Sequence, residues 1–333
     1  MPAVHEAAKV EVNVVVRPIP LAADHEPYFQ WSQSMLTLAS VALIAAHIYF
    51  FGWQSGSILT FIILSFLTGM GVTVGYHRLF THRSFETTRP IQLLLAVLGS
   101  MAGLGFFFNW VSAHRQHHQF SDTDGDPHSP NVHANTRWSR LLAFSRAHGG
   151  WMLFDRMNQD RMRYIPDLAA DPTLCLIQRL QLVWIGLGLL LPALFCYAIS
   201  PTWEAATAGL LWGGLLRIAV TSQITFCVNS VCHLWGLKPF ESRDESRNNS
   251  WVAMFALGEG WHNNHHAFPT SARHGLLPGQ FDGSYLFIRF LARLGLAWNI
   301  KLPTEEQMKA KMIATGRALS VSDGSLVIES SHR

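Results

Sequence analysis

The run IQLLLAVLGSMAGLGFFFN, residues 91–109, decides how this chain is arranged, because histidine-rich strings lie on both sides of it. The string HRLFTH (77–82) precedes the run, and HRQHH (114–118) follows it. The run is long enough to cross a membrane, since a hydrocarbon core of about 30 Å takes about 20 apolar residues. If it crossed, the two strings would lie on opposite membrane faces and could not form one site.

Four other apolar runs are long enough to span a bilayer: 34–53, 56–76, 180–199 and 205–228. If these four cross and 91–109 is a re-entrant or interfacial helix, every histidine string lies on one side. The short connections 53–57 and 200–204 contain no Lys or Arg, whereas the histidine-bearing segments contain many. We therefore expect an all-α, multi-pass membrane protein with four transmembrane helices and with its histidine strings facing the cytoplasm.

The composition agrees with a membrane protein and excludes several other classes. Charged residues make up only 14% of the 333 residues, against about 25% in soluble domains. The net charge of +3, without a long Lys/Arg block, argues against binding of nucleic acid. The four cysteines form no C-x-x-C pair, which predicts neither a disulfide framework nor a thiolate zinc site.

Three regions follow from the distribution of apolar residues. Residues 1–30 are mixed and interrupted by prolines, and we expect a flexible segment without a signal peptide. Residues 31–301 form the predicted membrane domain. Residues 302–333 are polar and without an apolar period, which predicts a C-terminal tail. We expect both termini to lie in the cytoplasm.

Nine histidines fall in the three strings HRLFTH, HRQHH and HNNHH and in the segment NSVCH. They are His77, His82, His114, His117, His118, His233, His262, His265 and His266. Positions i, i+3 and i+4 share one helix face, so each H-x-x-H-H triplet presents three imidazoles to one side. His77 and His82, at i and i+5, are about 140° apart on an ideal helix. They therefore suit a helix end or an unwound helix.

The number of imidazoles predicts two metal ions. Imidazole suits zinc, copper, iron and nickel, and nine nitrogens exceed the four of a closed zinc site. Carboxylate-bridged di-iron sites need two Glu-x-x-His motifs, and only one, Glu259 with His262, is found. We expect Glu259 to orient an imidazole through its N–H group. Asp124 and Asp126 are candidates for the same role, the alternative being that they cap the turn before Pro127.

Two other interpretations stay open at this point. The histidines of any one triplet could form a solvated polar face, or the chain could be a metal transporter that uses them as carriers. Transporters bind their ions near the membrane midplane, whereas these strings lie outside the apolar runs. Arg217, inside the run 205–228, is either a functional or paired residue at membrane depth or one that extends toward the interface.

The histidine strings, their order and their position beside the apolar runs resemble the integral-membrane fatty acid desaturase family, of the Δ9 acyl-CoA or acyl-lipid type. The resemblance covers about residues 34 to 300, in GVTVGYHRLFTHRSF, HRQHHQFSDTDGDPHSP, RYIPDLAADP, NSVCHLWG and SRNNSWVAMFALGEGWHNNHHAFPTSARHG. It implies that the nine histidines bind two iron ions and that Asn229 holds a metal-bound water. It also implies four membrane-spanning helices, a cytosolic helical cap and an enclosed tunnel for the acyl chain. The sequence does not divide the ligands between the two irons.

The same resemblance implies an O2-dependent enzyme that inserts a cis double bond, at Δ9, into a saturated acyl chain carried on coenzyme A or a lipid. Electrons from NAD(P)H would come through an external ferredoxin or cytochrome b5-like donor. The alternative with the same metal centre is a hydroxylase of acyl or sphingoid chains. We expect the tunnel floor in 35–75, near Phe66 and Met70. Six arginines could dock the donor or phosphate groups, or reflect positive-inside bias only: Arg137, Arg140, Arg146, Arg156, Arg161 and Arg163.

Overall fold

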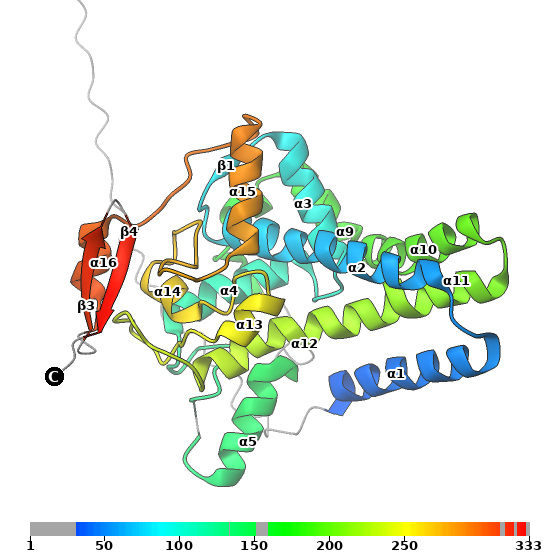
Figure 1. Ribbon diagram of the computed structural model, residues 1–333, viewed down its shortest axis with the longest axis horizontal. Helices are drawn as coiled ribbons and strands as arrows, with labels where there is room; N and C mark the ends of the chain where they lie inside the picture. The colour runs from blue at the N-terminus through cyan, green and yellow to red at the C-terminus, as the bar shows by residue number, and fades with distance from the viewer. Residues whose placement is uncertain (1–30, 133, 151–158, 314–316, 323–324, 331–333) are drawn as a thin grey trace, which may run out of the picture.

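The computed structural model describes residues 31–132, 134–150, 159–313, 317–322 and 325–330. The predicted flexible segment 1–30 and Arg156 lie outside the described residues. The fold is mostly helical, with a set of long helices lying side by side and shorter helices gathered at one end of them (Figure 1).

Among the described residues, three helices are long and apolar enough to cross a membrane. They are Gly56–Thr81, Gln181–Ile199 and Trp203–His233. The first consists of α2 (Ser55–Met70) and η1 (Gly71–Thr81); the second is α10 (Gln181–Ile199); the third joins α11 (Trp203–Gly209), η3 (Leu210–Leu216), α12 (Arg217–Ser230) and η4 (Val231–His233). The first predicted run lies in α1 (Trp31–Phe51), whose described apolar part, Leu38–Phe51, is shorter.

The run 91–109 does not form one helix. Helix α3 (Arg89–Met101) ends inside it, and α4 (Phe107–Phe120) begins near its end. Between them, Gly103 and Gly105 have φ values of +73° and +84°, a region that favours glycine because a Cβ atom would be strained there. This break excludes a single crossing helix in 91–109. Consequently the two histidine strings meet, with η1 packed against α4.

The remaining elements surround the end of the long helices where these strings lie (Figure 1). The helical ones are α5 (Arg137–Ser145), η2 (Arg146–Gly150), α7 (Gln159–Met162), α8 (Pro166–Ala169), α9 (Pro172–Arg179), α13 (Ser250–Phe255), α14 (His262–Ala267), α15 (Gly283–Arg293) and α16 (Glu305–Lys311). Strand β1 (Glu86–Thr87) pairs with β2 (Ala297–Trp298), and β3 (Arg317–Ser322) pairs with β4 (Ser325–Ser330), both antiparallel. The segment 302–333, expected to be a tail, thus contains α16 and a β-hairpin.

Close packing of η1 against α3 and α4 positions the first histidine string. A Cβ atom on Gly71 would lie 2.1 Å from the backbone nitrogen of Gly99, so only glycine permits this approach. Tyr76 stacks on Phe107 with ring centroids 4.6 Å apart, and its hydroxyl lies 2.8 Å from Ser100 Oγ. The residue after Tyr76 is His77, which is therefore fixed by a fully buried neighbour.

Arg217 is fully buried, and the structure decides between the two interpretations of it. Its guanidinium donates hydrogen bonds to the carbonyl oxygens of Met101 (3.0 Å) and Gly188 (3.1 Å). Gly188 lies four residues before Pro192, which has no N–H group to complete the bond within α10. Met101 is the last residue of α3. Arg217 therefore supplies the donors that two helices lack, and it does not extend to an interface.

Replacing Arg217 with methionine is expected to destabilise the fold. The two carbonyl oxygens lose their donor, and each unpaired buried carbonyl costs about 1–3 kcal/mol. Thermal unfolding of the purified protein, compared with Arg179→Met at an exposed position of α9, measures the loss. Adding Pro192→Ala returns an N–H group to Gly188, so the double variant should recover part of the stability. Equal melting temperatures for Arg217→Met and the parent protein would contradict this role.

Candidate metal centre

A change of helix type brings His77 and His82 together. Over Gly71–Thr81 the chain forms a π-helix, in which hydrogen bonds join residues i and i+5. The backbone nitrogen of His82 donates to the carbonyl oxygen of His77 at 3.1 Å, and the two rings lie 4.8 Å apart. In an α-helix, residues i and i+5 would lie on different faces. In this π-helix, both imidazoles lie on one side.

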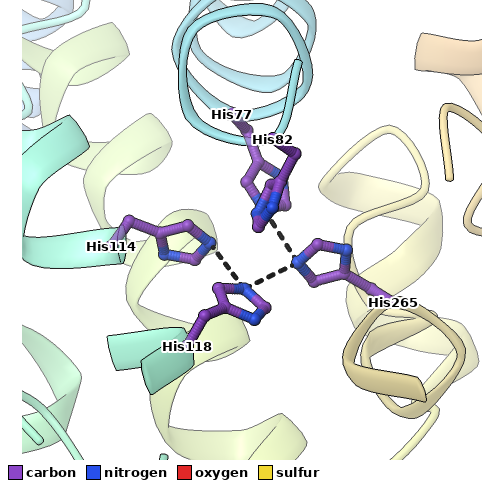
Figure 2. Close-up of side chains that lie close together, drawn as sticks. All are labelled: His77, His82, His114, His118 and His265. Carbon is purple, nitrogen blue, oxygen red and sulfur yellow. Dashed lines mark hydrogen bonds between the residues drawn. The ribbon is translucent and has the colours of Figure 1, made fainter. Parts of the chain in front are cut away.

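Five histidines form a first group, in which the ring nitrogens lie within 4.8 Å of one another (Figure 2). This five-histidine group consists of His77, His82, His114, His118 and His265. The Nε2 atom of His265 lies 3.1 Å from that of His77 and 2.9 Å from that of His118. Nitrogens 2.0–2.1 Å from a shared metal ion and at right angles would be about 3.0 Å apart. The spacing therefore fits imidazoles arranged around one ion.

The four-histidine group consists of His117, His233, His262 and His266. The Nε2 atoms of His233 and His262 are 3.0 Å apart, and those of His117 and His266 are 3.4 Å apart. The two groups are neighbours, because the rings of His118 and His266 stack at 4.5 Å. The structure thus divides the nine predicted ligands into five and four.

Helices α4 and α14 each supply both groups. In α4, His114 and His118 at i and i+4 join the five-histidine group, and His117 joins the other. In α14, His262 and His266, at i and i+4, belong to the four-histidine group, whereas His265, at i+3, belongs to the five-histidine group. The two groups are therefore built side by side along the same pair of helices.

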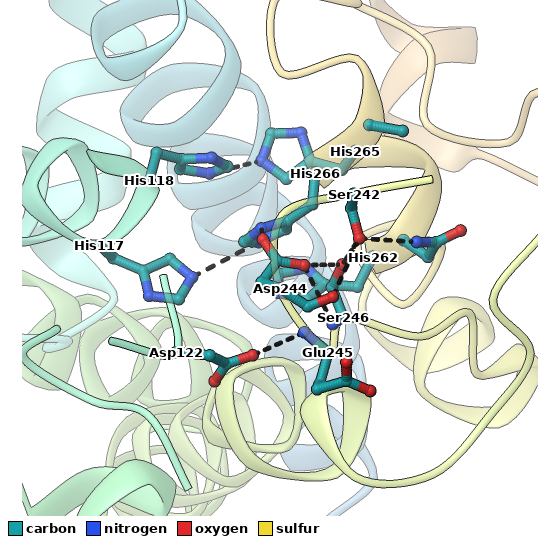
Figure 3. Close-up of polar contacts among 12 residues, drawn as sticks. His117, His118, Asp122, Ser242, Asp244, Glu245, Ser246, His262, His265 and His266 are labelled. Atoms are coloured by element: carbon teal, nitrogen blue, oxygen red, sulfur yellow. Dashed lines mark hydrogen bonds and ion pairs between the residues drawn. The ribbon is translucent and has the colours of Figure 1, made fainter. Parts of the chain in front are cut away.

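Carboxylates hold four of the rings by the nitrogen that faces away from the groups. The Nδ1 atom of His117 lies 2.9 Å from Asp126, that of His233 lies 3.0 Å from Asp122, and that of His266 lies 2.5 Å from Asp244. His77 Nδ1 makes the same contact with Glu259. Figure 3 shows Asp122 and Asp244 beside rings of the four-histidine group. Such contacts fix the ring orientation and the tautomer of a metal-binding histidine.

The tautomer of His266 leaves a lone pair facing His117. Burial lowers the pKa of His266 to about 4, so its ring is neutral near pH 7. A neutral ring that donates from Nδ1 carries its lone pair on Nε2. His266 donates from Nδ1 to Asp244, so its Nε2 lone pair faces the Nε2 atom of His117, 3.4 Å away. A cation between the two nitrogens would satisfy this lone pair, and this is the observation that fits a metal ion.

The protonation states of two rings in the five-histidine group agree with metal binding. Burial lowers the pKa values of His118 and His265 well below the usual range, so both rings are neutral and available as ligands. Burial alone would raise the pKa of Asp126, but its contact with His117 outweighs that effect and lowers the pKa to about 2. The buried Nδ1 atom of His265 and Nε2 atom of His82 have no hydrogen-bond partner within the described part of the chain.

An apolar cavity of about 440 Å³ ends at both histidine groups. Its walls come from one face of α2 and η1 (Phe61, Ser65, Phe66, Gly69, Val72 and Thr73) and from α12 (Val220, Thr221, Ile224, Thr225 and Val228). At its end lie His77 and His114 of the five-histidine group and His262 of the four-histidine group. Asn229 lies beside them. The expected floor residue Phe66 lines the cavity, whereas Met70 packs in the hydrophobic core.

Not all of the acidic residues expected to contact imidazoles do so in the structure. Glu259 and Asp126 contact imidazoles as expected, whereas Asp124 is exposed and Asp122 contacts His233 in its place. Sequence reasoning missed Asp122, although the D-x-D-x-D spacing in 122–126 was a visible signal. It also missed Asp244, for which the sequence gives no signal.

Two further buried residues near the five-histidine group were missed. Arg78, inside HRLFTH, donates to Glu259 Oε1 at 2.9 Å, and His274 Nδ1 lies 3.4 Å from Glu259 Oε2. Of the arginines considered for docking, Arg161 is buried and donates to Asn109. By contrast, Arg137, Arg140 and Arg163 are exposed.

Comparison with known proteins agrees with this geometry. The sequence model of one family, described as fatty acid desaturase, matches residues 52–278. The chain is 43% identical to a hex-5-enoyl-[acyl-carrier protein] acetylenase of Moorena producens, over 74% of this chain and 78% of that protein. It is 38% identical to an sn-1 stearoyl-lipid 9-desaturase of Synechocystis sp., over 81% of this chain and 79% of that one.

A third relative, Delta-9 acyl-lipid desaturase 1 of Arabidopsis thaliana, is 38% identical over 72% of this chain and 74% of its own length. The family match, residues 52–278, includes the histidine strings, the cavity walls and the three helices that are long enough to cross a membrane. The chain therefore belongs to the fatty acid desaturase family and is an oxidoreductase that acts on acyl chains.

Proposed function

We propose that this protein is a membrane desaturase that inserts a cis double bond at Δ9 into a saturated, lipid-linked acyl chain. The observation that carries the proposal is the cavity, whose apolar walls end at both histidine groups. An apolar chain in this cavity would be desolvated along its length, and its position relative to the histidines would be fixed by the walls. The lipid carrier and the Δ9 position are supported by the names of the Synechocystis and Arabidopsis relatives.

The nine histidines would hold two iron ions, five imidazoles around one and four around the other. Iron, when bound, would supply the O2-dependent oxidation that removes one hydrogen from each of two adjacent carbons, with two electrons and two protons completing the reduction of O2 to water. Carboxylates Asp122, Asp126, Asp244 and Glu259 hold the rings for this task. Asn229, at the end of the cavity, would hold a water molecule beside the four-histidine group. The electrons would come from NAD(P)H through a ferredoxin or cytochrome b5-like donor.

The arrangement in the membrane follows from the same features. We propose four crossings, by α1, α2 with η1, α10, and α11 to α12, with both termini and the histidine groups in the cytoplasm. Absence of Lys and Arg from the connections 53–57 and 200–204 supports this orientation. The histidines lie at the ends of the spans and not at their middle, which argues against a transporter.

A second dehydrogenation at the same carbons is the other candidate reaction. The relative from Moorena producens is named as an acetylenase that acts on a chain already unsaturated. The same cavity could present an alkene to the same histidine groups. Product mass separates the possibilities: a desaturase product has lost two hydrogens, an acetylenase product two more, and a hydroxylase product has gained one oxygen.

Expression in a membrane host rich in saturated C16 and C18 chains tests the reaction. We expect new monounsaturated chains with the double bond at Δ9, located by mass spectrometry of total lipids. His265→Ala removes a ring that contacts two others of its group, so product should fall at least about 100-fold. Oxygenated chains, or equal product from the variant, would contradict the proposal.

Cavity length is expected to set the length of the chain that reacts. Ser65→Phe would fill the space between α2 and α12, and should shift the product toward shorter chains, whereas Phe61→Ala should extend the range to longer ones. Gas chromatography of products from a mixed C14 to C20 pool measures the shift. Phe50→Ala on the exposed face of α1 is the control. An unchanged product profile for both cavity variants would rule out this cavity as the chain site.

A further inference from the structure

The two histidine groups differ in the carboxylates around them. In the four-histidine group, three of the four rings donate Nδ1–H to a carboxylate. The accepting carboxylates are those of Asp122, Asp126 and Asp244. The five-histidine group has one such contact, between His77 and Glu259.

The carboxylates of the four-histidine group keep their negative charge, because their further partners within the described part of the chain are neutral. Asp126 accepts from the backbone nitrogens of Asp122 and His128. Asp244 accepts from the hydroxyl and the backbone nitrogen of Ser246 (Figure 3). Asp122 accepts from Ser129, Asn131 and the backbone nitrogen of Glu245. Lys238 donates to the backbone carbonyl oxygen of Asp244, but within the described residues no Lys or Arg side chain pairs with any of the three carboxylates.

The carboxylate of the five-histidine group is compensated. Arg78, fully buried, donates to Glu259 Oε1 at 2.9 Å and to Asp282 Oδ1 at 3.0 Å. Its single positive charge is shared between these two carboxylates and therefore offsets part of the negative charge of Glu259, which acts on His77. The other four rings of this group make no carboxylate contact within the described residues, and the buried Nδ1 of His265 is without a partner there. Less negative charge therefore acts on the rings of the five-histidine group, and fewer of these rings are held in orientation by a carboxylate.

We infer that the two metal sites are unequal, and that the four-histidine group binds its ion more tightly and releases it more slowly. The inference rests on the proposed di-iron site. Carboxylates that accept from a ligand ring raise its basicity and fix its orientation, and losing one typically costs 10–100-fold in metal affinity. The five-histidine group has one more imidazole, which adds one neutral ligand. The four-histidine group has three carboxylate contacts against one in the five-histidine group, and we expect this difference to affect metal affinity more than the additional imidazole does.

Release of iron to a coloured ferrous chelator tests the inference on the purified full-length protein in detergent. We expect two phases of equal amplitude, one ion per chain in each, with rates that differ at least about 10-fold. His265→Ala should lose the fast phase and keep the slow one, which assigns the slow ion to the four-histidine group. His262→Ala should do the reverse.

Charge variants then test the cause. Asp244→Asn keeps an acceptor for His266 but removes the charge, and should speed the slow phase about 10-fold without altering the fast one. Glu245→Gln removes the same charge one residue away, on an exposed side chain that contacts Lys238 and Arg247, and should alter neither phase. Asp122→Asn repeats the test at a second carboxylate if the first variant is not recovered folded.

The outcomes separate this inference from the proposed function. Two irons per chain released in one phase, or a slow phase that survives in His262→Ala, would overturn the inequality and leave the desaturase proposal intact. A chain that takes up no iron would refute the metal centre and the inference together. Two unequal irons in a chain that forms no alkene would support the inference and count against the proposed reaction.

Discussion

The contact between a carboxylate and the outer nitrogen of an imidazole is the interaction on which the rest of this structure depends. Four such contacts, to His77, His117, His233 and His266, turn the inner nitrogens toward a common space. Each joins a helix to a loop or turn, and the partners range from nine residues apart, for His117 and Asp126, to 182 residues apart, for His77 and Glu259. A cation in that space would bind inward nitrogens from several elements of the fold. The site and the fold around it are therefore stabilised together when metal binds.

A second constraint acts in the middle of the long helices. Backbone groups at membrane depth have no water to bond with, so each must find a partner inside the protein. Pro192 leaves the carbonyl of Gly188 unpaired, α3 ends at Met101, and Arg217 donates to both. This buried arginine ties α12 to α10 and to α3, which carries the chain back from η1 toward α4. The relative placement of the first two histidine strings thus depends on a residue far from the histidines.

Much of the fold followed from apolar runs and histidine spacing. A re-entrant or interfacial helix was expected in 91–109 because the two strings had to meet, whereas the structure has two helices there with the glycines at 103 and 105 between them. The π-helix was not predictable in type, although the i, i+5 spacing of His77 and His82 indicated a departure from α-helix. The division into five and four could not be predicted, because it depends on which way each triplet is rotated in the tertiary structure. Asp244 lies in a loop whose partner is chosen only by folding.

The distribution of carboxylates has a chemical consequence for the family to which this chain belongs. Direct carboxylate ligands would lower the positive charge of a metal centre, whereas the carboxylates here act through a ring and leave nine imidazoles in the two groups. The centre keeps its charge while its geometry is fixed, and the negative groups stay on the side away from the cavity. Glu259 lines the cavity, and its Oε1 atom accepts a hydrogen bond from Arg78. An apolar chain in this cavity would therefore meet imidazoles and the amide of Asn229 at its end. The one carboxylate there is paired with Arg78, which would suit the oxidation of a methylene group that has no charge of its own to orient it.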